Sequence, residues 1–374
     1  MKVGFLPIAR TTFDIPYAEH QAQIALDTLH RGSHTVVGDA ELKTDDVAVT
    51  STAQALADDG VEAIVVLQAS FADSSLAVAA SSVGVPLILW AFSEPRTGGR
   101  LRLNSFCGIN LAAYTLTQFD RSFSWIHAQP DDIRINDQIG ATPTAPTASA
   151  EPITTTAEDR SRAVEVVGRL RETTIGRIGE RPDGFEPCGY EADTLEATVG
   201  VSVAEVALPE LFSRAASADD DAVALAMRRS AAFLDGMDAV DQSELDRSLR
   251  INAGLRSLIE EGGWSGVATR CWPETFTEFG GAACTPMALL TEDGTPGACE
   301  ADVYGNITGL IMTWLAGSAS FVADLVDVDH ETNTGVFWHC GLAPFEMADP
   351  SSHPTATVHS NRRMPLLSEF PLKP

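Results

Sequence analysis

Lysine is nearly absent from this chain: Lys2, Lys43 and Lys373 are the only lysines, and all other basic residues are arginines. The 52 acidic side chains outnumber the 25 basic ones, which gives a formal net charge of −27. A surface with this charge repels phosphate, so nucleic-acid binding is excluded as the main role. The acidic excess with few lysines suits a halophilic protein, because concentrated salt screens self-repulsion. A GC-rich genome that favours arginine over lysine explains the same bias.

Paired cysteine motifs and long apolar runs are also missing. The six cysteines include no CxxC pair, which argues against a disulfide scaffold or a zinc-finger module. No apolar run approaches the ~20 residues of a membrane span. Arg10 and Asp14 precede any apolar core of a signal peptide, so the sequence predicts a cytoplasmic protein. The spacings of a Walker loop, a GxGxxG fingerprint and a GxSxG elbow are absent as well.

The first part of the chain alternates strand and helix patterns. Residues 61–68 and 85–92 are nearly continuous apolar runs rich in β-branched residues, as in strands covered on both faces. Helical patterns closed by glycine, at 50–60 and 74–84, precede them. The pattern predicts an N-terminal α/β domain over residues 1–136, with a doubly wound, Rossmann-like parallel sheet.

A Thr/Ala/Pro-rich stretch at 137–157 predicts a surface insertion or linker. A second α/β series follows and predicts a middle domain over 158–292, also with a parallel sheet. Residues 293–374 are strand-rich and predict a short α/β C-terminal portion, a partial domain. The expected strands of the middle domain lie at 173–179, 201–208 and 264–272, and its two long helices at 218–237 and 243–263.

Four carboxylates in one segment are the strongest candidates for chemistry: Glu274, Glu278, Glu300 and Asp302. If residues 273–290 form one helix, Glu274 and Glu278 share a face, and neighbouring buried carboxylates need a cation or a shared proton. Oxygen ligands with one imidazole would suit Mn²⁺ or Mg²⁺ better than zinc. The alternative is that Glu274 caps a helix and Glu278 faces solvent, each contributing ~0.5–1 kcal/mol.

Among the histidines, His339 alone lies inside a strongly apolar strand pattern, where a hydrogen-bonded core residue and a metal ligand are both possible. Four cysteines in apolar contexts are expected to be buried and inert. They are Cys271, Cys284, Cys299 and Cys340.

Two early segments carry polar side chains after predicted strands. Residues 7–14 contain Arg10, and residues 93–110 contain Arg96, Asn104 and two glycines. A Gly/Arg loop at the end of a strand can bind an anion or sugar hydroxyls through backbone N–H groups. An interdomain or intersubunit loop is the competing interpretation.

Six strings together resemble the L-fucose/D-arabinose isomerase-like family, in its shorter, poorly characterised branch. They are PIARTTFD, PRTGGRLRLNSFCGIN, RCWPETFTEFGGAAC, ACEADVYG, DLVDVD and FWHCG. The resemblance runs along the whole chain apart from the Thr/Pro insertion, and it implies an aldose–ketose isomerase with Mn²⁺ or another divalent cation. Such an enzyme moves a proton between C1 and C2 of a sugar through a cis-enediol.

Carried over residue by residue, the resemblance assigns Asp302 and Glu278 as metal ligands and proton carriers. Glu274 competes with Glu278, and Glu300 and His339 complete the expected ligand set. On the substrate side, Arg10 matches an arginine that approaches the sugar in a neighbouring subunit's site. That shared site implies a homotrimer or homohexamer. Arg96, Asn104 and Trp272 are the further expected substrate-binding residues.

In the family, a strand-rich region with a late metal-binding histidine follows a segment like EFPLKP, at which this sequence stops. The sequence therefore predicts a chain that lacks the end of the last domain, or one in which His339, His353 or His359 substitutes. A non-catalytic sugar-binding or regulatory protein is the alternative function. An epimerase or lyase that uses the same enediol is a third, and the sequence does not name the sugar.

Overall fold

The computed structural model describes residues 1–95, 101–139, 154–329, 331–349, 351, 353–358 and 365–369. The chain divides into two compact units. Unit 1 comprises Met1–Ala150, Asp183–Pro187 and Asp324–Trp338, and unit 2 comprises Glu151–Pro182, Cys188–Ala323 and His339–Pro374. Within the described ranges, no helix combines the length and the apolar character that crossing a bilayer requires.

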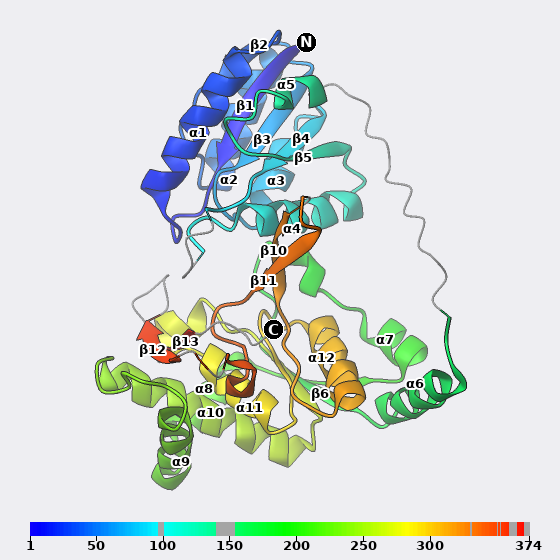
Figure 1. Cartoon of the computed structure of the whole chain (residues 1–374), viewed down its shortest axis with the longest axis vertical. Helices are drawn as coiled ribbons and strands as arrows, with labels where there is room; N and C mark the ends of the chain where they lie inside the picture. The colour runs from blue at the N-terminus through cyan, green and yellow to red at the C-terminus, as the bar shows by residue number, and fades with distance from the viewer. Residues whose placement is uncertain are drawn as a thin grey trace. The chain divides into compact units, whose positions relative to one another are not determined.

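Unit 1 contains a five-stranded parallel sheet in the order β2-β1-β3-β4-β5 (Figure 1). This confirms the predicted doubly wound N-terminal fold. The strands are β1 (Lys2–Ile8), β2 (Thr35–Gly38), β3 (Ala63–Gln68), β4 (Leu87–Ala91) and β5 (Phe123–His127). The helices are α1 (Ile15–His30), α2 (Asp46–Asp58), α3 (Ser74–Ser81), α4 (Ser105–Gln118) and α5 (Ile135–Gln138).

Both faces of this sheet are covered, which explains the unbroken apolar runs. In β3, Val65 and Leu67 belong to the core packed on one face, together with residues of α1. Ile64 and Val66 belong to the core on the other face, with residues of α2, α3 and α4. Alternate side chains of a strand point to opposite faces, so a strand that is buried on both faces has apolar residues at successive positions.

A hairpin distant in sequence also belongs to unit 1. The strands β10 (Asp324–Asp329) and β11 (Thr334–Trp338) pair antiparallel, and β10 packs against α4. Asn110 of α4 donates its side-chain amide to the backbone carbonyl of Leu325, at 3.4 Å. The DLVDVD string thus adds polar side chains to the N-terminal unit.

Unit 2 contains a four-stranded parallel sheet in the order β7-β6-β8-β9. Its strands are β6 (Thr174–Ile178), β7 (Ser202–Val206), β8 (Gly266–Thr269) and β9 (Gly297–Ala298). Its α-helices are α6 (Ala157–Leu170), α7 (Ala192–Val199), α8 (Leu208–Ala216), α9 (Asp220–Ala231), α10 (Gln242–Gly262), α11 (Cys284–Glu292) and α12 (Val303–Ala316). The shorter elements of unit 2 are η2 (Thr275–Phe279), η3 (Phe345–Met347) and an antiparallel pair, β12 (Thr355–Val358) with β13 (Pro365–Glu369). The short helix η1 (Glu186–Cys188) lies where the chain passes from unit 1 to unit 2.

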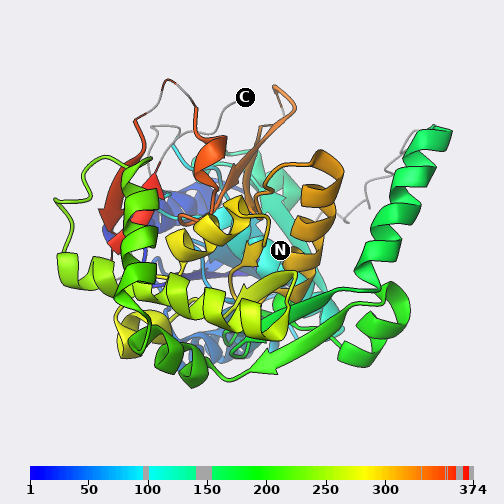
Figure 2. The ribbon, with the colours of Figure 1, turned by 90° about the horizontal axis from the view of Figure 1, so that it is seen from below.

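Helices again cover both faces of the sheet. Ile251, Leu255 and Leu258 of α10 pack on one face, in a cluster with Ile178 and Val267. Figure 2 shows α10 as a long yellow-green helix. Helices α6 and α12 pack on the other face. The second parallel sheet expected from the sequence is therefore confirmed, and its carboxyl edge carries the loops that hold the candidate carboxylates.

One expectation about this edge is wrong: residues 273–290 do not form a single helix. A π-helical turn, η2, ends at Gly280, which has a φ of 84°, and α11 begins only at Cys284. A Cβ on Gly281 would lie 2.9 Å from the backbone nitrogen of Ser248, so the glycine pair allows the chain to pass close to α10.

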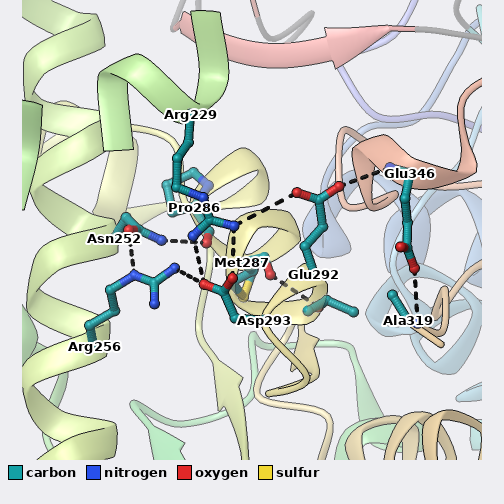
Figure 3. A network of polar contacts seen from close by, with 10 residues as sticks. Arg229, Asn252, Arg256, Pro286, Met287, Glu292, Asp293, Ala319 and Glu346 are labelled. Atoms are coloured by element: carbon teal, nitrogen blue, oxygen red, sulfur yellow. Dashed lines mark hydrogen bonds and ion pairs between the residues drawn. The ribbon is translucent and has the colours of Figure 1, made fainter. Parts of the chain in front are cut away.

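A polar network fixes the end of α11 (Figure 3). Arg229 of α9 donates to both carboxylate oxygens of Asp293, at 2.6 and 2.8 Å, and Arg256 of α10 donates to the same carboxylate. Asn252 donates to the carbonyl of Pro286 at 2.8 Å. These hydrogen bonds join α9, α10 and α11.

Candidate active site

The candidate site lies at the carboxyl edge of the sheet in unit 2, where parallel α/β folds bind their ligands. A cavity of about 570 Å³ opens there. Among the residues lining it are Glu274 and Glu278, which both come from the loop after β8. The other lining residues are Arg177, Gly179, Glu180, Glu205, Val206, Ala207, Leu208, Pro209, Phe212 and Arg270.

Glu274 is held by a bidentate ion pair. The guanidinium of Arg270 donates to its two carboxylate oxygens, at 2.6 and 2.7 Å. These hydrogen bonds lower the pKa of Glu274 against the opposing effect of its burial. Glu278 lines the same cavity with an exposed side chain. Of the two competing glutamates, Glu278 is the one open to a ligand.

Ion pairs between arginine and glutamate side chains line the cavity. Arg177 pairs with Glu180 at 3.0 Å and with Glu205 at 2.9 Å. Tyr190 donates its hydroxyl to Glu205 at 2.7 Å. Burial, followed by this hydrogen bond, raises the pKa of Tyr190 to about 12, so the phenol stays protonated and acts as a donor.

Asp302 stands at the N-terminus of α12, in the loop after β9. Its carboxylate accepts a hydrogen bond from the backbone N–H of Gly305 at 2.9 Å and thus caps the helix. The two preceding residues, Glu300 and Ala301, have φ values of 54° and 55°. Left-handed backbone at two successive residues that are not glycine is strained, and strain of this kind concentrates at functional sites.

Glu300 gathers three side chains around its carboxylate. Trp272 donates its indole N–H to Oε1 at 3.2 Å, and the Sγ atom of Cys271 lies 3.7 Å from the same oxygen. The Nε2 atom of His339 lies 3.9 Å from Oε2. The structure therefore brings together Glu300, His339 and Trp272 of the predicted site residues. His339 directly follows β11, and its side chain is buried.

Arg10 and Asn104, two predicted residues of the N-terminal unit, lie at the carboxyl edge of its own sheet. Arg10 follows β1 and donates its backbone N–H to Ser70 Oγ at 3.0 Å. Asn104 is buried at the start of α4 with a φ of 54°, and its side-chain oxygen has no hydrogen-bond partner among the described residues. Arg96 and His359 lie outside the described residues, and His353 is exposed.

Sequence reasoning missed a second cavity, of about 380 Å³, in unit 1. Ser93, after β4, donates to Asp327 Oδ1 at 2.6 Å, and His127, at the end of β5, lies 3.5 Å from the same oxygen. The imidazole and the carboxylate are both buried. The sequence indicated this aspartate only as part of the DLVDVD string. Its contacts could not be predicted, because Ser93 and His127 lie some 200 positions earlier in the chain.

The four cysteines of the apolar segments form one cluster, which the sequence did not reveal. Cys284 and Cys340 have their sulfur atoms 4.0 Å apart, and Cys340 Sγ lies 3.7 Å from His339 Nδ1. Hydrogen bonds from Cys299 and Cys340 lower the pKa of Cys284 to about 6, whereas burial raises that of Cys271 to about 11. The predicted burial is confirmed for Cys271, Cys284 and Cys299, whereas Cys340 is only partly buried.

The expected Mn²⁺ ligands are not gathered at one point. Among the described residues, one group of three or more ligating side chains has all its ligand atoms within 4.8 Å of one another: Cys271, Cys299 and Glu300. Glu278, Asp302 and His339 do not form such a group. Two sulfur atoms and one oxygen atom are not the donor set that Mn²⁺ prefers. The Mn²⁺ site therefore stays a prediction.

Comparison with known proteins shows which family and which proteins the chain resembles in sequence. The family described as "Fucose/sulfoquinovose isomerase, N-terminal domain" matches residues 4–140. A sulfoquinovose isomerase of Alkalicoccus urumqiensis is 30% identical over 375 residues, covering 100% of this chain and 80% of that protein. The sulfoquinovose isomerase of Priestia megaterium is 28% identical over 373 residues, covering 99% of this chain and 79% of that protein.

Proposed function

This chain belongs to the fucose/sulfoquinovose isomerase family, and we propose that it converts sulfoquinovose, or a closely similar aldose, into the corresponding ketose. As a member of that family it is an aldose–ketose isomerase, an intramolecular oxidoreductase. The similarity along the entire chain to sulfoquinovose isomerases carries the proposal. The cavity with Glu278 at the carboxyl edge of the second sheet supports it.

The reaction moves one hydrogen from C2 to C1 of the sugar. A base removes the proton from C2, the electron pair of that bond forms a double bond between C1 and C2, and the aldehyde oxygen takes a proton to give the enediol. Loss of the C2 hydroxyl proton and protonation at C1 then give the ketose. We assign Glu278 as the base, because Glu274 is already paired with Arg270. Asp302 is its proposed partner for the hydroxyl proton.

Mn²⁺ remains the cofactor we expect, because carboxylate oxygen atoms suit that ion. No proton transfer is assigned to it, since the expected ligand atoms are not gathered within one group. Removal of metal with a chelator, followed by addition of Mn²⁺, Mg²⁺, Co²⁺ or Zn²⁺ one at a time, tests this part of the proposal. Activity that survives complete removal of metal would contradict it.

Proton exchange followed by NMR in D₂O tests the isomerase proposal. The protein would be incubated with sulfoquinovose, L-fucose or D-arabinose while the C2 proton signal and the ketose signals are recorded. We expect Glu278→Gln and Asp302→Asn to lower the exchange rate by ~10²–10⁴-fold, the usual contribution of an acid or base. Asparagine caps helices about as well as aspartate, so Asp302→Asn removes the charge and keeps the cap.

Glu260→Gln is the matched control, because it removes an exposed carboxylate of α10 in the same unit. It should leave the exchange rate unchanged. Wild-type exchange rates in both site variants would refute the assignment of the two carboxylates. A folded wild-type protein that binds a sugar without exchanging any proton would refute the isomerase proposal and favour a binding role.

A further inference from the structure

The cysteine cluster has no place in the proposed isomerisation. Its members come from four parts of unit 2: Cys271 follows β8, Cys299 follows β9, Cys284 opens α11, and Cys340 lies shortly after β11. Neighbouring strands of a parallel sheet end at the same edge, so the first two sulfur atoms meet there beside Glu300. Both cysteines of this group are buried, Glu300 is partly buried, and the group contains more sulfur than oxygen.

We propose that Cys271, Cys299 and Glu300 bind a thiophilic divalent cation of the Zn²⁺ class. The proposal does not depend on the isomerase activity, because it concerns a donor set that the proton transfer does not use. Thiolate ligands select Zn²⁺ and its soft relatives, whereas Mn²⁺ and Mg²⁺ prefer carboxylate and water oxygen atoms.

The geometry is close to that of a bound ion. With Zn–S near 2.3 Å and Zn–O near 2.0–2.2 Å, two ligands of a tetrahedral zinc site lie about 3.5–3.8 Å apart. Cys271 Sγ and Glu300 Oε1 are 3.7 Å apart, and all three ligand atoms lie within 4.8 Å of one another. Side-chain adjustments of about 1 Å or less would bring them into coordination.

The surroundings hold the carboxylate in place. The indole N–H of Trp272 binds Glu300 Oε1, the oxygen nearest to Cys271, and His339 approaches the other oxygen. Such partners orient a ligand and typically change metal affinity ~10–100-fold when they are removed. Cys271 and Cys299 belong to the apolar core of the unit, where few waters compete for a cation.

A fourth ligand is available from two directions. The thiol of Cys284 is hydrogen-bonded to that of Cys299, so its sulfur lies next to the group. Alternatively a water molecule completes the tetrahedron from the side of Glu300, whose side chain is 19% exposed. Glu300 is therefore the ligand through which an ion enters from solvent.

Cobalt spectroscopy tests the proposal on the full-length protein freed of metal under reducing conditions. Co²⁺ would be added without sugar, because a thiolate ligand produces an intense charge-transfer absorption that oxygen and imidazole ligands do not. We expect this absorption to saturate at one Co²⁺ per chain and to disappear when Zn²⁺ is added. A failed isomerase assay would leave this result untouched.

Matched variants locate the ion. Cys271→Ser and Cys299→Ser should each weaken the charge-transfer absorption, and the double variant should lack it. Trp272→Phe should weaken Co²⁺ binding ~10–100-fold. Cys188→Ser is the control, because Cys188 is partly exposed in η1 and does not belong to the group. It should show the charge-transfer absorption of the wild type, and so should Glu278→Gln.

A measurement on the wild-type protein tests the proposal even if the cysteine variants fail to fold. The ¹¹³Cd NMR shift of the wild-type complex reports how many thiolates bind the ion, and we expect at least two. A cadmium shift typical of oxygen and nitrogen ligands only would overturn the proposal. So would a charge-transfer absorption that persists when both Cys271 and Cys299 are replaced by serine.

Discussion

Replacing Gly176 by alanine should destabilise unit 2, because the space for a Cβ is already filled by an indole ring. Gly176 lies in the middle of β6, between β7 and β8. An ideal Cβ there would be 2.0 Å from Cε3 and 2.2 Å from Cζ3 of Trp264. The strand is paired on both sides, so the backbone cannot retreat, and the indole must move by about 1 Å or more to restore van der Waals distance.

The indole has little room to move. A Cβ on Gly262, at the end of α10, would lie 2.1 Å from Trp264 Nε1, so the ring is enclosed by a strand and a helix end. Overpacking of this kind costs ~1–3 kcal/mol, and the lower chain entropy of alanine offsets about 0.5–1 kcal/mol of it. The net loss is up to about 2.5 kcal/mol, and at ~2–4 °C per kcal/mol for a unit of this size we expect Gly176→Ala to lower the melting temperature by up to about 10 °C.

Thermal unfolding followed by circular dichroism measures this effect, with Gly168→Ala as the matched control. Gly168 lies within α6, and a Cβ there meets nothing within 4 Å. The same substitution should therefore stabilise the protein by ~0.5–1 kcal/mol, because alanine favours the helix. The two glycine-to-alanine changes are expected to have opposite signs.

A double-mutant cycle with Trp264→Leu assigns the cause. If the clash with the indole is responsible, Gly176→Ala should cost much less once the ring is absent. Gly176→Ala as stable as the wild type would refute the reasoning. An equal loss of stability in the presence and absence of the indole would show that the strand backbone, and not Trp264, rejects the methyl group.

Two further predictions concern charge and assembly. Hydrogen bonds from Arg229 and Arg256 outweigh desolvation and lower the pKa of Asp293. The stabilisation from Asp293 is therefore present above the unfolded pKa near 3.8 and is lost as the pH falls through the lower folded pKa. Asp293→Asn should reduce the free energy of unfolding at neutral pH and make it depend less on acid pH in urea titrations, and an unchanged acid dependence would contradict this. If the homotrimer or homohexamer forms with Arg10 acting in a neighbour's site, inactive Arg10→Ala and Glu278→Gln proteins should regain activity when refolded together, whereas separate refolding should leave both inactive.

Much of the fold could be predicted from the sequence because burial on both faces leaves a local signal. The run at 61–68 predicts a strand without a solvent face, and β3 occupies Ala63–Gln68. The strands predicted at 173–179 and 201–208 also lie close to the observed limits of β6 and β7. Local patterns fail where the backbone is set by contacts from far away, as at Gly280, where the predicted helix breaks in order to pass α10.

The candidate site was predicted as a set of residues but not as an arrangement. Apolar context around Cys271 and Cys299 indicates burial, and both are buried. Their contact with each other depends on β8 and β9 being neighbours in the sheet, which no local pattern records. The pairing of Glu274 with Arg270 is equally invisible, because it depends on the side-chain directions after β8.

The loop Cys299–Asp302 connects the two proposals and also keeps them separable. Its strained residues, Glu300 and Ala301, turn the chain so that Glu300 joins the sulfur atoms while Asp302 caps α12. A thiophilic cation would draw on Cys299 and Glu300, and proton transfer would draw on Asp302. Asp302→Asn should therefore lower the exchange rate ~10²–10⁴-fold and keep the cobalt absorption. Cys299→Ser should weaken the cobalt absorption and leave the exchange rate unchanged if proton transfer does not need the bound cation. Loss of both signals in Cys299→Ser would instead mean that the bound cation orders the loop in which the proton carrier stands.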